Sequence, residues 1–297
     1  MSDHTTHQSP ENMVTPLNCA KALRFADMHK HGPFILANVW DAGTARLMAA
    51  LGAKALATSS AAHAFTLGRP DGGRLRREEA IAHAVEINGA TALPVNADLE
   101  NGFGDSLEDV ALTVQNSIEQ GLAGCGIEDI QFPTQNPYAF EDAVERIEAA
   151  VAAKRSATKA NDVQFTLTAR ADGVMIGSYD LDEAVRRIKA FARAGADVIY
   201  VPMPASFEDL AVIVKSVDVP VNALCAGPFT QYSVADYAKI GVARISLGSA
   251  LARAVHKTIF DAAQQMFDGA EFSALSNGIP GGTIDELLAK GGTGLKK

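Results

Sequence analysis

The chain has 297 residues, of which 47% are hydrophobic and 21% are charged, proportions typical of a soluble globular protein. A formal net charge of −9 argues against nucleic-acid binding, which depends on clustered Lys and Arg. Three scattered cysteines exclude a disulfide framework and a structural zinc site. No run reaches the ~20 apolar residues of a membrane helix. Residues 1–16 are polar, lack the apolar core of a secretory signal, and are expected to be flexible. We therefore expect a soluble, cytoplasmic protein.

Short apolar runs alternate with longer helical patterns along the chain, after an extra helix expected at Cys19–Lys30. Short runs rich in Val, Ile and Leu are typical of strands buried on both faces. The expected strands are Phe34–Val39, Ala55–Ser59, Leu93–Asp98, Gly124–Glu128, Phe165–Arg170, Val198–Met203, Val219–Leu224 and Arg244–Gly248. The expected helices are Thr44–Leu51, Arg76–Ile87, Leu107–Glu119, Glu141–Lys154, Leu181–Arg193, Phe207–Ser216, Val234–Ile240 and Ala250–Asp268.

Eight strand–helix units predict an α/β fold, a closed (β/α)8 barrel over residues 17–272, with an open doubly wound sheet as the alternative. No Gly-x-Gly-x-x-Gly follows the first strand, so a dinucleotide site has no support. Residues 273–297 are rich in glycine and are expected to form an irregular tail. The last helix, Ala250–Asp268, carries an apolar stripe. This stripe either covers its own barrel or is exchanged with a neighbouring chain.

Polar residues collect at the carboxyl ends of the expected strands, where barrels of this kind place their chemistry. These residues are Ser59, Ser60, Asp98, Glu100, Glu128, Asp129, Arg170 and Asn222. Carboxylates that meet in a barrel mouth repel one another unless a cation or protons intervene. Mg²⁺ prefers such oxygen ligands and uses one or two carboxylates plus waters. The alternative is that these acids cap the following helices and pair with Arg170.

Three positions after the expected strands can be interpreted in more than one way. If the third strand continues past Asp98, its alternation places Asn96, Asp98 and Glu100 on one side. Arg170, facing acids and an anionic substrate, is interpreted as a bidentate carboxylate clamp, although a lone Arg there also fits a salt bridge. His63, after the second strand, is either a general base or a solvent-facing loop residue.

Seven short segments around the strand ends form a set in a fixed order. They are Asn38-Val-Trp-Asp41-Ala-Gly, Thr58-Ser-Ser60, Gly68-Arg-Pro-Asp71-Gly, Asn96-Ala-Asp98-Leu-Glu100-Asn-Gly-Phe-Gly104, Gly126-Ile-Glu128-Asp129, Thr168-Ala-Arg170-Ala-Asp172 and Val221-Asn222. Together they resemble the isocitrate lyase/phosphoenolpyruvate mutase superfamily, particularly its small members related to 2-methylisocitrate lyase and carboxyphosphonoenolpyruvate mutase. The resemblance runs from about Phe34 to Gly269.

The resemblance implies a Mg²⁺ site in which Asp98 binds the ion directly or nearly so, while Glu100 and Glu128 reach it partly through water. It implies that Asp71 orients the substrate or a metal-bound water. The residues implied to hold the carboxylate and oxo oxygens of a small 2-oxo or 2-hydroxy acid are Ser59, Ser60, Arg170 and Asn222. Such a site stabilises an enolate-type intermediate. The resemblance also implies a homotetramer whose last helices are exchanged between neighbours.

The segment after the fourth strand departs from the family pattern. The lyases carry Lys-x-Cys-Gly there, whose thiol supplies a proton, and the phosphorus–carbon branch carries a lysine on the same loop. Residues 129–138 contain neither Cys nor Lys, and Pro202 stands where the lyases typically have a glutamate. Tyr138 is either a substitute acid or an aromatic that packs the loop. The leading interpretation is a Mg²⁺-dependent carbon–carbon lyase, and the alternatives are phosphorus–carbon chemistry or oxo-acid binding without turnover.

Overall fold

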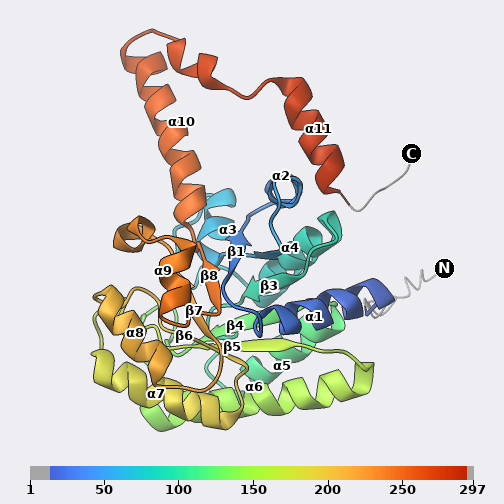
Figure 1. Ribbon diagram of the computed structural model, residues 1–297, viewed down its shortest axis with the longest axis vertical. Coiled ribbons are helices and arrows are strands. Elements are labelled where there is room, and N and C mark those ends of the chain that lie inside the picture. The colour runs from blue at the N-terminus through green and yellow to red at the C-terminus, as the bar shows by residue number, and fades with distance from the viewer. Residues whose placement is uncertain (1–13, 293–297) are drawn as a thin grey trace, which may run out of the picture.

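The computed structural model describes residues 14–292, which contain a closed barrel of eight parallel strands (Figure 1). Each strand pairs with the next, and β8 returns to pair with β1. The strands are β1 (Phe34–Asn38), β2 (Ala55–Ala57), β3 (Val95–Asp98), β4 (Gly124–Glu128), β5 (Thr166–Arg170), β6 (Val198–Tyr200), β7 (Val221–Leu224) and β8 (Arg244–Ser246). The expected (β/α)8 barrel is therefore confirmed, and the open-sheet alternative is wrong.

Helices surround this barrel in the order that the sequence predicts, with additions. They are α1 (Pro16–Met28), α2 (Ala42–Ala50), α3 (Ser60–Thr66), α4 (Arg77–Ala90), α5 (Leu107–Glu119), α6 (Phe140–Asn161), α7 (Leu181–Ala194), α8 (Phe207–Lys215), α9 (Val234–Lys239), α10 (Ala250–Asp268) and α11 (Gly281–Gly291). Two short 3-10 helices lie at η1 (Gly227–Gln231) and η2 (Ser273–Asn277). The extra first helix begins at Pro16 rather than Cys19, because Thr15 caps it and accepts a hydrogen bond from the Asn18 amide.

The strands separate an apolar layer outside the barrel from a polar interior. Outward-facing residues such as Cys125, Ile127 and Leu167 are fully buried against the helices. Cys125 therefore belongs to the core. Alternation along the strands turns polar side chains such as Asn96 and Thr168 into the barrel. This arrangement leaves a polar cavity inside an apolar shell.

Helix α1 closes the amino-terminal end of the barrel. Phe25 on α1 is fully buried and packs edge-to-face against His29 and Phe34, with ring centroids 4.9 and 6.1 Å away. The Nδ1 of His29 donates to the Phe25 carbonyl at 2.8 Å. Its Nε2 then accepts from the Nη1 of Arg244, at 3.3 Å. Since Phe34 and Arg244 are the first residues of β1 and β8, α1 joins the floor of the barrel to its closing strands.

The carboxyl-terminal segment differs from the irregular tail expected at 273–297. Residues 281–291 form α11, which packs against α2. Ile284, Leu287 and Leu288 recur at helical spacing on α11 and are half-buried. A Cβ at Gly291 would collide with the Arg46 carbonyl, so a glycine there permits the close approach. Residues 1–13 of the segment expected to be flexible, and 293–297 of the tail, lie outside the described residues.

Helix α10 extends away from the barrel instead of covering it (Figure 1). Ala252, near its start, is its buried residue, whereas Ile259, Phe260 and Phe267 are exposed. The interpretation that this helix covers its own barrel is therefore wrong. Between residues 14 and 292, none of the helices is long and apolar enough to cross a membrane.

Candidate active site

A polar cavity of about 190 Å³ opens at the carboxyl ends of the strands. Every strand contributes to its wall. Six of the strand-end residues expected from the sequence line it, together with Asp71: Ser59, Ser60, Asp98, Glu128, Arg170 and Asn222. The strand ends thus bring together most of the residues that the sequence predicts for the site.

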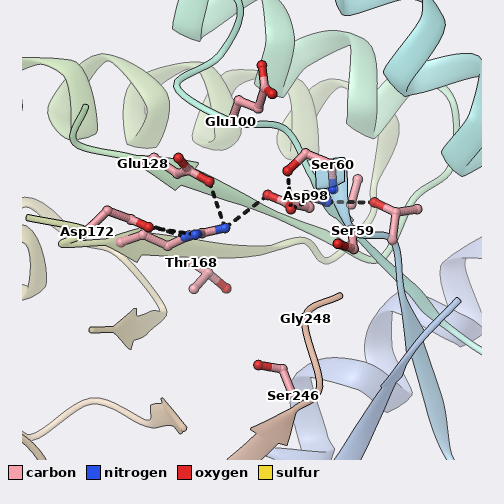
Figure 2. Close-up of polar contacts among 12 residues, drawn as sticks. Ser59, Ser60, Asp98, Glu100, Glu128, Thr168, Asp172, Ser246 and Gly248 are labelled. Carbon is pink, nitrogen blue, oxygen red and sulfur yellow. Dashed lines mark hydrogen bonds and ion pairs between the residues drawn. The ribbon is translucent and has the colours of Figure 1, made fainter. Parts of the chain in front are cut away.

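Arg170, the last residue of β5, is the centre of the polar contacts. Its Nη1 lies 3.0 Å from Oδ1 of Asp98 and 2.9 Å from Oε1 of Glu128. Its Nε and Nη2 bind both oxygens of Asp172, at 3.2 and 2.6 Å. The guanidinium also lies 5.0 Å from the ring centre of Tyr200. Arg170 therefore pairs with three carboxylates at once, as Figure 2 shows.

Burial and the guanidinium act in opposite directions on these carboxylates. Burial raises the pKa of Glu128 well above its usual range, and Arg170 opposes that shift. Burial likewise raises the pKa of Asp172 to about 6, again opposed by Arg170. Asp71, at the exposed rim of the cavity, has its pKa raised by desolvation and by Asp98. Burial therefore favours the neutral form of these carboxyl groups, and Arg170 favours the charged form of Glu128 and Asp172.

The short helix α3 links the serines to Asp98. Ser59 caps α3 and accepts from the amide of Ala62 at 3.3 Å. Ser60 donates its amide and its hydroxyl to Oδ2 of Asp98, both at 2.8 Å. The amide of Asp98 in turn donates to Oγ1 of Thr58 at 2.8 Å. Asp98 is thus held on one side by α3 and on the other by Arg170.

Glu100 lies apart from Asp98 and Glu128, contrary to the expectation that the three carboxylates share one centre. Strand β3 ends at Asp98, and Glu100 has a φ of 47°, so strand alternation no longer applies. Its side chain points away from the cavity (Figure 2) and accepts from the amide of Gly73 at 3.1 Å. Burial raises the pKa of Glu100 to about 7. The expected convergence is correct for Asp98 and Glu128 only.

Asp129 and Tyr138 support the loop after β4 from outside the cavity. Asp129 follows Glu128 and so faces the opposite side of the sheet, where Arg187 and the hydroxyl of Tyr179 donate to it at 3.0 and 2.7 Å. The buried Tyr138 hydroxyl donates to Asp105 at 2.6 Å. Tyr138 therefore packs the loop, and its pKa is raised by burial and by Asp105. The loop itself contributes Phe132 and Gln135 to the cavity wall.

His63 lies in α3 rather than in a solvent-facing loop. It is buried, and its ring stacks on that of His83 with centroids 3.7 Å apart. Desolvation and the neighbouring His83 lower the pKa of His63 to about 4, so it is neutral near pH 7. It does not line the cavity. Its position indicates a packing role.

Asn222 belongs to the deep wall of the cavity, next to residues that sequence reasoning missed. Its Nδ2 donates to Oγ of Ser246 at 2.8 Å, and its Oδ1 accepts from Nε of Arg244 at 2.9 Å. Asp172 and Arg244 were not among the expected site residues. Both had a signal in the sequence: Asp172 comes two residues after Arg170, and Arg244 is a charge inside a buried strand.

The donor set at the mouth of the cavity fits Mg²⁺. Asp98 and Glu128 supply carboxylate oxygens, Asp71 lies at the rim and Ser60 adds a hydroxyl, all of which are hard ligands. Among the described residues, no group of three or more His, Cys, Asp or Glu side chains is arranged to hold a metal ion. Mg²⁺ does not require one, because it typically uses one or two carboxylates with waters and substrate.

The chain is similar to several known enzymes. The family model described as phosphoenolpyruvate phosphomutase matches residues 25–267. The oxaloacetate decarboxylase of Paraburkholderia xenovorans is 30% identical, over 85% of this chain and 83% of that protein. The 2-methylisocitrate lyase of Escherichia coli is 31% identical, over 68% of each chain. A crystal structure from Burkholderia cenocepacia, provisionally assigned as a lyase/mutase, has 40% identity and a TM-score of 0.87, covering 92% of this chain and 98% of its own.

Replacing Arg170 tests the charge balance of the site. Arg170→Met leaves Asp98, Glu128 and Asp172 without their shared counter-charge, so we expect the free energy of unfolding to fall by about 3–5 kcal/mol at pH 8. Losing Arg170 raises the folded-state pKa of Glu128 and of Asp172 further above the unfolded values, because Arg170 now opposes the effect of burial on both. Protonation at pH 5 therefore relieves part of the penalty, and the loss becomes smaller there. Urea unfolding at both pH values measures this difference.

The matched control is Arg76→Met, since Arg76 is 76% exposed and pairs with Glu79 at the surface. We expect this variant to unfold almost as the unchanged protein does. Equal losses in the two variants, or a larger loss for Arg170→Met at pH 5 than at pH 8, would contradict the charge balance described here.

Proposed function

Because the chain belongs to the phosphoenolpyruvate phosphomutase family, in the isocitrate lyase/phosphoenolpyruvate mutase superfamily of enzymes, we propose that it is a Mg²⁺-dependent lyase. It cleaves a carbon–carbon bond of a small 2-oxo or 2-hydroxy carboxylic acid through an enolate-type intermediate. The observation that carries this proposal is the pairing of Asp98 and Glu128 with one nitrogen of Arg170 in the cavity. Two hard anionic ligands and one cation then face the same space.

Each site residue has a distinct role in this proposal. Asp98 is the principal metal ligand, Glu128 assists it, and Glu100 contributes through water on the outer side. Ser59 and Ser60, at the start of α3, bind the carboxylate of the substrate, for which the amide and hydroxyl of Ser60 exchange Oδ2 of Asp98. Arg170 and Asn222 hold its oxo or hydroxy oxygen, and Asp71 orients the substrate at the rim.

Charge development explains why these groups favour lyase chemistry. Breaking the bond next to a 2-oxo carbon leaves negative charge on its oxygen, and fixed donors lower the energy of that charge. Bound Mg²⁺ supplies Lewis-acid polarisation of the same oxygen. Arg170 is fixed in position by Asp172, so it needs little reorganisation as the charge forms.

Turnover assays separate this proposal from its alternatives. The full-length protein is incubated with oxaloacetate, 2-methylisocitrate or phosphonopyruvate, with and without Mg²⁺. We expect Mg²⁺-dependent release of a carbon–carbon cleavage product from one of the first two acids. Turnover of phosphonopyruvate alone would instead support phosphorus–carbon chemistry, as the family name suggests. Absence of turnover across a wider set of 2-oxo and 2-hydroxy acids would support a binding protein.

The metal assignment is tested by two substitutions and calorimetric titration with Mg²⁺. Asp98→Ala removes the principal ligand, so we expect no measurable binding. Glu100→Gln weakens binding by at most about 10-fold, because contacts through water can be rebuilt. The titrations are made at pH 8, where Glu100, with its pKa raised to about 7, is mostly ionised. Each variant then removes one carboxylate charge, so the pair also serves as its own control. Unchanged Mg²⁺ affinity in Asp98→Ala would show that the assigned centre is wrong.

The proposal also includes a homo-oligomer, in which α10 of one chain packs on a second copy of the chain. The exposed Ile259 and Phe267 on α10 support it. We expect light scattering to report an assembly larger than one chain, and a chain ending at Ser249 to lose assembly and solubility. Ile259→Asp with Phe267→Asp should reduce the mass, whereas Val212→Asp on α8 should not. A monomer at micromolar concentration would exclude the exchange.

A further inference from the structure

Arg244 is a buried cation without an acidic partner. It is 2% exposed, and within residues 14–292 no carboxylate lies in ion-pair distance of it. Its three hydrogen bonds go to neutral groups, Oδ1 of Asn222 at 2.9 Å, Oγ1 of Thr168 at 3.1 Å and Nε2 of His29 at 3.3 Å, and its guanidinium lies 6.0 Å from the ring centre of Phe25. A guanidinium has more N–H donors than these contacts use. Its charge is therefore left uncompensated by the protein.

His29 does not change this balance. Its Nδ1 must donate to the Phe25 carbonyl, so Nε2 carries no proton and accepts from Arg244. Burial and the charge of Arg244 lower the pKa of His29 to about 3, which keeps it neutral. Burial similarly lowers the pKa of Arg244 to about 9, and Arg170 adds to that effect. The two arginines therefore repel each other across the cavity.

The two arginines differ in what holds them. Asp98, Glu128 and Asp172 occupy the nitrogens of Arg170. Arg244 has no such partner, although it too lines the cavity. A buried unpaired charge is costly, and an apolar side chain of similar volume avoids that cost. Packing alone therefore does not account for an arginine at this position.

The wall near Arg244 is built to receive a polar group. Thr168, Asn222 and Ser246 lie there, below the carboxylates in Figure 2 where Thr168 and Ser246 are labelled. Gly126 adds no side chain to this part of β4. The cavity thus continues from the anionic mouth towards a cation.

We infer that the deep end of the cavity is a second anion site, in which Arg244 binds the far carboxylate of a dicarboxylic 2-oxo or 2-hydroxy acid. This inference rests on the proposed function, which places the first carboxylate at Ser59 and Ser60. The substrate then spans the cavity, with one end at the start of α3 and the other at the floor. Arg244 is a specificity-determining residue, because it distinguishes a carboxylate from an apolar group at that end.

The test compares two four-carbon acids that differ only at the far end, racemic malate and racemic 2-hydroxybutyrate. Titration calorimetry of the full-length protein with Mg²⁺ gives the dissociation constant of each. We expect malate to bind about 10- to 100-fold more tightly, the range for a charge-assisted contact in a buried site. Arg244→Met should remove that preference, so we expect the ratio of the two dissociation constants to fall to about 1. Arg76→Met controls for the loss of one positive charge.

Arg244→Lys keeps the charge without the planar fork, so we expect it to retain part of the preference for malate. Thermal unfolding shows whether Arg244→Met folds. If it does not, the preference for malate is compared between Arg244→Lys and the unchanged protein, and this comparison tests the inference. Equal binding of the two acids by the unchanged protein would overturn the inference, as would full preference for malate in either Arg244 variant. A preference for malate without turnover of any acid would contradict the proposed lyase activity but would support the second anion site.

Discussion

The sharing of Arg170 by three carboxylates is the constraint on which the site depends. Asp98, Glu128 and Asp172 come from β3, from β4 and from the residues after β5. Burial opposes ionisation of Glu128 and Asp172, and the guanidinium opposes that effect. One cation therefore fixes the carboxyl ends of three neighbouring strands.

Support for this centre comes from residues on the opposite side of the strands. Alternation sends Glu128 inward and Asp129 outward, where Arg187 and Tyr179 bind it. Asp129 also accepts from the amide of Asp172 at 2.8 Å. The partner of Arg170 is thus anchored by a second, separate ion pair. Preorganisation of this kind is what an active site requires of its outer contacts.

The barrel and most of the cavity wall could be predicted from sequence because both follow from local periodicity. Short apolar runs marked every strand, and the polar residues at their ends converge for geometric reasons. Glu100 was misplaced because the end of β3 is set by a backbone turn that periodicity does not report. Helix α11 was not predicted, because the glycines of this segment outweighed the helical spacing of its apolar residues. The role of Arg244 was not predicted, because it depends on which residues contact Arg244 in the folded chain.

The closure of β8 on β1 has a consequence for how the protein is made. Oδ1 of Asn38 accepts from the amides of Leu247 and Gly248, so contacts that seal the barrel join residues 209 and 210 positions apart in the sequence. A ribosome has to deliver the chain as far as β8 before this seam can form, and such distant pairings are slow to establish. Until then the nascent sheet keeps an open parallel edge, which is prone to association with other chains. Arg244 is also delivered on β8, the last strand of the barrel, so the interior is completed only after that strand has been made.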